Sequence, residues 1–150
     1  MNDILGVDEK KIKEATFTAN IVLFWLKADY LLTNKRVTGR TPNTFFGIVP
    51  FGERKFAQPL PAIASVASST RFFFMRLIVG LALVFIGFEF ISSFGIILVF
   101  LGIIKIMNSY TATFIITNNS GQREGYEISI LQKSDVEEFV SKVNETIAGS

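Results

Sequence analysis

The chain has 150 residues, of which 49% are hydrophobic, and it carries sixteen phenylalanines and a formal net charge of +2. This length suits one domain rather than two. The sequence contains no cysteine and no histidine, which excludes disulfides, thiol nucleophiles, zinc sites of the usual kind and imidazole acid–base chemistry. The composition therefore predicts a protein that is not an enzyme and that has neither a cofactor nor a metal site.

Residues 1–15 are polar and of mixed charge. We expect a polar N-terminal segment there, with a short helix as one alternative. No apolar h-region follows it, so we expect no signal peptide. Nothing else in the first seventy residues could span a bilayer, and we therefore expect this part to stay in the cytoplasm.

Alternating apolar and polar residues predict strands in the first half of the chain. The alternation over residues 16–26 predicts the first strand. Residues 29–41 predict two strands joined by a turn at 33–35, and residues 44–60 predict two short strands joined through 50–53.

The clearest strand pattern covers residues 110–131, where two alternating runs flank the turn residues Asn-Asn-Ser-Gly. An amphipathic helix is expected after it, with Ser134 and Glu137 as a capping box and Gly149 at its end. Its apolar stripe consists of Val136, Phe139, Val140, Val143 and Ile147.

Between Arg76 and Lys105 lie 28 residues, of which only Glu89 is charged. As one straight helix they would be about 42 Å long, against a hydrocarbon core of about 30 Å. Such a helix would also bury Glu89 near its middle, at a cost of a few kcal/mol. We therefore predict a two-helix membrane hairpin over residues 72–105 that bends near 89–93. The predicted tip residues are Glu89, Ser92 and Ser93.

Four glycines favour this bend. Folding the segment about Ile91 places Gly80 opposite Gly102 and Gly87 opposite Gly95, and small residues at matching heights let two helices approach closely. The alternative is that glycines are simply common in membrane helices. Each arm has about fourteen apolar residues, roughly 20 Å, so the hairpin either spans a thinned bilayer or is deeply re-entrant. A helix buried in a soluble core is the remaining alternative.

Cations crowd toward the start of the apolar segment, as the positive-inside tendency expects of cytoplasmic flanks. Arg71, Arg76 and Lys105 are predicted to contact lipid headgroups and set the topology of the hairpin. A second basic set could contact an anionic membrane surface, the alternative being an ordinary solvated surface. This basic set consists of Lys35, Arg36, Arg40, Arg54 and Lys55.

Three stretches resemble the bacterial pleckstrin-homology-like domain: YLLTNKRV at 30–37, PLPAIASV at 59–66 and DVEEFVSKV at 135–143. The resemblance covers roughly residues 16–71 and 110–148. It implies a bent, barrel-like sheet or sandwich of about seven strands with a C-terminal capping helix. Together with the predicted membrane hairpin, which interrupts the domain and departs from the simplest members of the family, this gives a membrane-anchored β + α fold.

On this interpretation, residues 16–71 and 106–150 form one discontinuous domain. That arrangement requires residues 62–69 to pair with 110–117, with the hairpin as a long excursion between neighbouring strands.

These features predict a non-enzymatic, membrane-tethered module at the cytoplasmic face of the inner membrane, which recruits a protein partner or assembles into a homo-oligomer. Two alternatives remain, an anionic-lipid-sensing domain and an accessory subunit of a larger membrane complex. The expected partners are the lipid bilayer and another protein or copy of the chain; neither nucleic acid nor a small-molecule substrate is expected.

Overall fold

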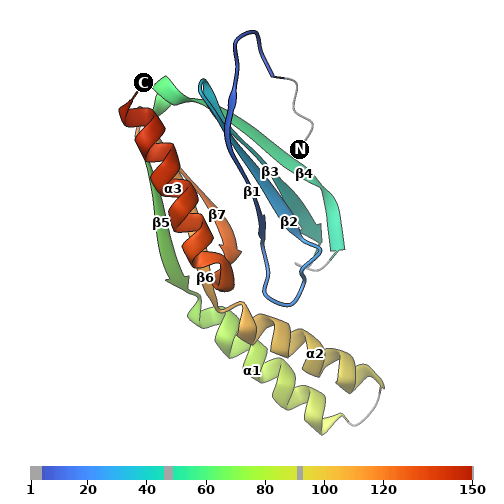
Figure 1. Ribbon diagram of the computed structural model, residues 1–150. Helices are drawn as coiled ribbons and strands as arrows, with labels where there is room; N and C mark the ends of the chain where they lie inside the picture. Colours follow the sequence, from blue (N-terminus) through green and yellow to red (C-terminus); the bar gives the residue numbers. More distant parts are fainter. Residues whose placement is uncertain (1–4, 46–48, 91–92, 150) are drawn as a thin grey trace.

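The computed structural model describes residues 5–45, 49–90 and 93–149. Within these ranges the chain forms seven strands and three α-helices (Figure 1). The strands are β1 (Lys11–Thr18), β2 (Lys27–Thr33), β3 (Arg36–Phe45), β4 (Val49–Pro59), β5 (Ile63–Phe72), β6 (Tyr110–Asn118) and β7 (Arg123–Ser129). The helices are α1 (Phe74–Glu89), α2 (Ser93–Met107) and α3 (Lys133–Ala148), with short 3-10 turns at Leu60–Ala62 and Ile130–Gln132.

The strands form two antiparallel sheets, one in the order β1-β2-β3-β4 and the other in the order β5-β6-β7. In the second sheet, Val66 lies opposite Ile116 and Phe72 lies opposite Tyr110. The expected pairing of residues 62–69 with 110–117 is therefore confirmed. Helices α1 and α2 connect β5 to β6 and project from one end of the sheets, as Figure 1 shows.

One hydrophobic core is shared by both sheets and α3. At its centre, the ring of Tyr30 lies 5.3 Å from that of Phe114 and 6.1 Å from that of Phe139, measured between ring centroids. These three rings come from the first sheet, the second sheet and α3, so none of the three layers can bury its apolar face without the others.

The predicted hairpin over residues 110–131 is confirmed as β6 and β7. Its turn is held by Asn118, whose Oδ1 accepts the backbone N–H groups of Ser120 and Gln122. Gly121 supplies the positive φ of +82° that the turn needs.

The predicted C-terminal helix is confirmed as α3, and its four buried residues, Val136, Phe139, Val140 and Val143, belong to the expected stripe. The capping box is wrong. A 3-10 turn runs directly into α3, which begins at Lys133 without a side-chain cap, so Ser134 already lies inside the first helical turn.

The predicted strand over residues 16–26 is also wrong, because β1 ends at Thr18. The side chain of Asn20 accepts the backbone N–H groups of Val22 and Leu23, and such local bonds compete with strand pairing. The segment from 19 to 26 is a loop instead, closed by the Ala19 N–H donated to the Leu26 carbonyl at 2.8 Å.

Two further expectations concern the first sheet. The turn at 33–35 between β2 and β3 is confirmed. Residues 50–53, predicted to join two strands, instead belong to β4. The described part of the N-terminal segment, residues 5–15, contains a turn followed by the start of β1 and no helix.

The predicted membrane hairpin is wrong. No helix in the described ranges is both long enough and apolar enough to cross a membrane. The reason is length: α1 has 16 residues and α2 has 15, and a 16-residue helix reaches only about 24 Å against a hydrocarbon core of about 30 Å. The predictions of transmembrane helices and of a location in the inner membrane depended on this hairpin and are therefore wrong as well.

The predicted fold class is wrong for the same reason, since it required a membrane-anchored chain with an inserted membrane hairpin. The two sheets are also separate and not closed into one barrel-like sheet. The chain does leave α1 at Glu89 and enter α2 at Ser93, while Ile91 and Ser92, predicted at the bend and the tip, lie outside the described residues.

A glycine substitution tests how closely α1 and α2 pack. A Cβ atom at Gly102 would lie 2.7 Å from the Gly80 carbonyl oxygen and 2.6 Å from a Val84 methyl. We expect Gly102→Ala to lower the free energy of unfolding by about 1–3 kcal/mol, the opposite sign to the gain that Gly→Ala gives in a free helix. Thermal unfolding measures it.

The control is Ala82→Leu, which enlarges an exposed side chain of the same helical pair and should change stability by less than about 0.5 kcal/mol. A Gly102→Ala protein as stable as the wild type would contradict the close packing.

Candidate functional site

Helices α1 and α2 pack against each other through their glycines. A Cβ atom at Gly80 would lie 2.8 Å from the Gly102 carbonyl oxygen, and one at Gly87 would lie 2.7 Å from the Gly95 carbonyl oxygen. The structure thus brings together the two glycine pairs named from the sequence. We call these glycines and the residues that they contact on the opposite helix the inner row; its members are Gly80, Val84 and Gly87 of α1 and Gly95, Val99, Gly102 and Ile106 of α2.

A second row of apolar residues lies beside the inner row on both helices. Each of its members lies one residue after an inner-row residue, or one residue after the position seven residues before an inner-row residue. One residue corresponds to a rotation of about 100° around the helix axis. Because α1 and α2 run antiparallel, the same rotation turns both rows toward the same side of the pair. We call this side the outward face; its residues are Phe74, Ile78, Leu81, Phe85 and Phe88 of α1 and Ile96, Phe100, Ile103 and Met107 of α2.

The outward face is apolar throughout and exposed. All nine side chains are between 43% and 73% exposed. In α1 they recur at intervals of four and three residues, from Phe74 to Phe88, and in α2 at the same intervals, from Ile96 to Met107. This is the spacing with which one helix packs along another, yet nothing in the described chain covers these residues.

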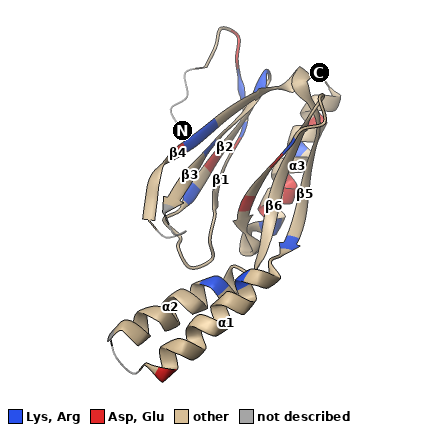
Figure 2. Cartoon of the chain, turned by 180° about the vertical axis from the view of Figure 1, so that it is seen from behind, with Lys and Arg blue, Asp and Glu red and all other residues tan. Residues whose placement is uncertain are grey.

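Charges are confined to the two ends of the helical pair. Figure 2 shows the pair without charge between the cations near the sheets and an acidic residue at the far end of α1. That acidic residue is Glu89, the last residue of α1, and it is exposed. It was predicted at the hairpin tip together with Ser92, which lies outside the described residues, and Ser93, which begins α2.

The three cations predicted to set the topology have different surroundings. Arg76 forms an ion pair with Glu127 of β7 at 2.9 Å, donates to the Asn108 carbonyl and lies 4.0 Å over the Phe73 ring. Arg71 lies 5.6 Å from the same ring. Lys105 is exposed on α2, and no acidic side chain within the described ranges pairs with it.

Two asparagines join the helical pair to the first sheet. Asn108, buried just beyond α2, donates to the Asn20 side chain at 2.8 Å and to the Ile104 carbonyl at 2.9 Å. Its Oδ1 accepts the Ile21 N–H at 3.1 Å. Leu23 and Leu26, in the loop between β1 and β2, pack on Ile104. The loop between β1 and β2 is therefore bonded and packed onto α2.

A cavity of about 230 Å³ lies at this junction. Leu101 and Lys105, which line it, each precede an inner-row residue by one position, and they therefore lie on the side of the pair opposite the outward face. Residues of the loop, β3 and β7 complete its wall. We call it the junction cavity.

The basic set is not gathered into one free surface. Arg40 and Lys55 are both within 4 Å of Glu53, at 3.4 and 3.9 Å, and Arg54 lies 3.8 Å from Glu124. Lys35 donates to the Val7 carbonyl at 2.6 Å. Each of these cations has an acidic or carbonyl partner in the structure.

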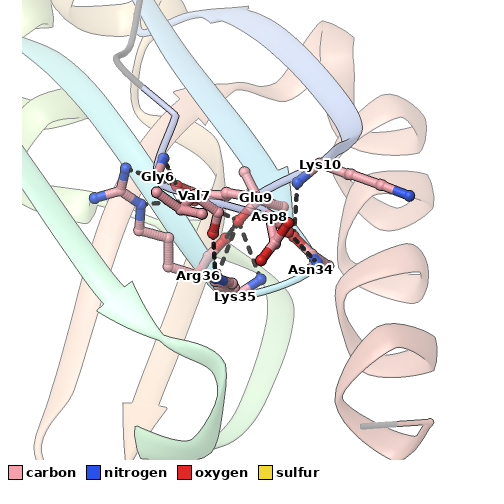
Figure 3. Close-up of polar contacts among 9 residues, drawn as sticks. Gly6, Val7, Asp8, Glu9, Lys10, Asn34, Lys35 and Arg36 are labelled. Carbon is pink, nitrogen blue, oxygen red and sulfur yellow. Dashed lines mark hydrogen bonds and ion pairs between the residues drawn. The ribbon is translucent and has the colours of Figure 1, made fainter.

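Arg36, the fifth member of the basic set, pairs with Glu9 (Figure 3). Its Nε donates to Glu9 Oε1 at 2.8 Å, and the Gly6 N–H and the Thr33 hydroxyl also donate to the Glu9 carboxylate, at 2.7 and 2.8 Å. These bonds lower the pKa of Glu9 from 4.5 to about 2, the Gly6 N–H contributing most, then Arg36 and Thr33. The cluster ties the N-terminal segment to the turn between β2 and β3.

The described residues contain no group of three or more Asp, Glu, His or Cys side chains that could hold a metal ion. Comparison with known proteins finds no family model, no curated protein and no solved structure that matches this chain. The identification with the bacterial pleckstrin-homology-like domain, which included an inserted membrane hairpin, therefore fails: no family match supports it, and the described helices include no membrane span.

Sequence reasoning missed both the outward face and the junction. The spacing of Phe74, Ile78, Leu81, Phe85 and Phe88 is visible in the sequence, but every residue between 77 and 88 is apolar or glycine, so no polar face marks a direction. The bond between Asn20 and Asn108 joins residues 88 positions apart, and no local pattern signals it.

Removing Asn108 tests the junction. Asn108→Ala leaves the Ile21 N–H and the Asn20 side chain without their partner, so we expect the free energy of unfolding to fall by about 1–3 kcal/mol. Urea denaturation measures it. Asn20→Ala should add little in the double variant, since both act on one network; fully additive losses would contradict the shared bond.

Glu9 predicts a pH dependence. Because its folded-state pKa is about 2 against an ordinary value of 4.5, its stabilisation is fully present above the ordinary pKa and is lost as the pH falls toward 2. Glu9→Gln should be less stable than the wild type at neutral pH, and the difference should shrink through this window. Urea denaturation across pH measures it; a constant difference would contradict the assignment. Arg36→Gln is the companion variant. It should also be less stable than the wild type at neutral pH, by a smaller amount than Glu9→Gln.

Proposed function

We propose that this chain is a non-enzymatic scaffold that assembles with a second copy of itself through the outward face of α1 and α2. The observation that carries the proposal is the row of nine exposed apolar side chains with the spacing of a helix-packing seam. The two sheets and α3 would stand at the outside of the assembly, since the helical pair projects from one end of them (Figure 1).

The area of the outward face supports this proposal. Its four phenylalanine side chains, between 52% and 69% exposed, present about 500 Å² of surface, and all nine residues present on the order of 900 Å². The largest apolar patch on a typical monomer is about 300–600 Å². A standard protein interface covers about 800 Å² of each partner, so the outward face is large enough for one.

The lack of charge favours a second copy as the occupant. A partner for this face must itself be apolar along the length of two short helices, because any unpaired charge buried there would be costly. The chain presents such a surface itself, and a two-fold axis places the same patch on both sides. Two helical pairs would then form a four-helix bundle, with the outward faces as its centre.

The non-enzymatic part of the proposal has separate support. The chain has no histidine and no cysteine, which are the commonest general base and thiol nucleophile. Among the acids that could replace them, Glu9 forms an ion pair with Arg36 and Glu127 forms one with Arg76. An anionic-lipid sensor is not favoured, because the basic set is paired with acids and a carbonyl.

Phe85→Ser tests the assembly. Phe85 is 69% exposed, and burying that area of phenyl surface is worth about 3 kcal/mol. We expect the wild type to be a dimer by sedimentation equilibrium. Because both copies carry the substitution, the dimer dissociation constant of the variant should rise by at least about 100-fold.

Phe94→Ser is the matched control. Phe94 is 64% exposed on α2 but precedes Gly95 and so lies on the side opposite the outward face; this variant should assemble like the wild type. A wild type that stays monomeric at all concentrations would overturn the proposal, and so would equal effects of the two substitutions. A constant second protein in stoichiometric amount would indicate an accessory subunit instead.

A further inference from the structure

Part of the wall of the junction cavity is apolar. Leu26 and Ile104, which are 2% and 6% exposed, line it together with Ala19, Pro42 and Leu101. These residues come from the loop between β1 and β2, from β3 and from α2, so the cavity exists only where the helical pair meets the sheets.

The polar groups of the junction cavity carry a net positive charge. Arg76 and Glu127 neutralise each other through two contacts, 2.9 Å from Nη1 to Oε2 and 3.0 Å from Nη2 to Oε1. Lys105 lines the cavity as well and has no acidic partner among the residues that the structure describes. Its ammonium group is therefore the uncompensated charge of the site.

A hydrogen-bond donor lines the same cavity. Asn20 also lines the cavity, and its Oδ1 accepts three N–H groups, those of Val22, Leu23 and the Asn108 side chain. The Asn20 amide nitrogen has no partner within the described part of the chain and retains its donors. An acceptor with a negative charge would satisfy both Lys105 and Asn20.

The volume limits the size of an occupant. At about 30 Å³ for each water-sized unit, a cavity of about 230 Å³ holds roughly eight non-hydrogen atoms. Binding sites of this kind combine apolar walls with a few convergent polar groups.

We propose that the junction cavity binds a small amphiphilic carboxylate. Its short apolar body lies against Leu26, Leu101 and Ile104, and its carboxylate accepts from Lys105 and the Asn20 amide. This inference does not depend on self-assembly, because Leu101 and Lys105 lie on the side of the helical pair away from the outward face.

Titration of the full chain with hexanoate tests the site. Binding is measured by calorimetry and by the NMR signals of the Asn20 side-chain amide and the Ile104 methyl groups. Hexanamide is the neutral isostere. We expect saturable binding of hexanoate with shifts of both signals, and about tenfold weaker binding of hexanamide because the charge-assisted contact is lost.

Two variants separate this site from general binding to exposed apolar surface. Lys105→Met removes the charge at an exposed position and should weaken hexanoate binding about tenfold. Lys142→Met is the matched control on α3, where Lys142 pairs with Glu145 at 2.9 Å, and should leave binding unchanged. The proposal is overturned if hexanoate does not saturate, if hexanamide or Lys105→Met binds equally well, or if the shifts occur at Phe85 and Phe100 instead.

Discussion

The antiparallel pairing of β5 with β6 is the interaction on which both the core and the helical pair depend. It runs from Ile63 opposite Asn118 to Phe72 opposite Tyr110, and the Phe73 N–H donated to the Ser109 carbonyl at 2.6 Å extends it by one more bond. The chain that leaves β5 must therefore return to a neighbouring point. Two antiparallel helices of nearly equal length meet that requirement, with both ends held by the sheet.

The glycines then determine which apolar residues are left exposed. Because the carbonyl oxygens of Gly80 and Gly102 occupy the space where a Cβ atom would stand on the other helix, the two helices meet largely backbone against backbone. Few large side chains fit between them. The phenylalanines must point elsewhere, and five of those in α1 and α2 are at least half exposed. Close packing within the pair thus creates the apolar surface that the proposed assembly would cover.

Ion pairs serve to attach segments rather than to present charge. Glu9 and Arg36 attach the N-terminal segment to the turn between β2 and β3, and Arg76 and Glu127 attach α1 to β7. Both pairs are reinforced by hydrogen bonds to backbone groups, which gives them better geometry than an isolated surface pair. Lys105 differs because it has no acidic partner in the described structure, and it borders a cavity that apolar residues line.

Local patterns in the sequence were sufficient for the elements whose stability is local. The β6–β7 hairpin follows from alternation and an Asn-Gly-rich turn, and the stripe of α3 follows from its apolar period, because each is a repeat of neighbouring residues. The fold-back of residues 74–107 was also visible in glycines placed symmetrically about residue 91. The capping box failed by two residues, Gln132 standing at the N-cap in place of Ser134, since a preceding 3-10 turn decides where the helix begins.

Tertiary structure alone decided the rest. The composition shows that residues 77–104 are strongly apolar. A membrane span also depends on helix length, and α1 and α2 are each too short for one. Whether Arg36 and Arg76 face an anionic surface or an acidic residue depends on Glu9 and Glu127, which lie 27 and 51 positions away. The sequence by itself determined the amount of apolar surface and the turns between β2 and β3 and between β6 and β7. Long-range contacts determined which of that surface is buried, because burial requires a second surface that no local pattern describes.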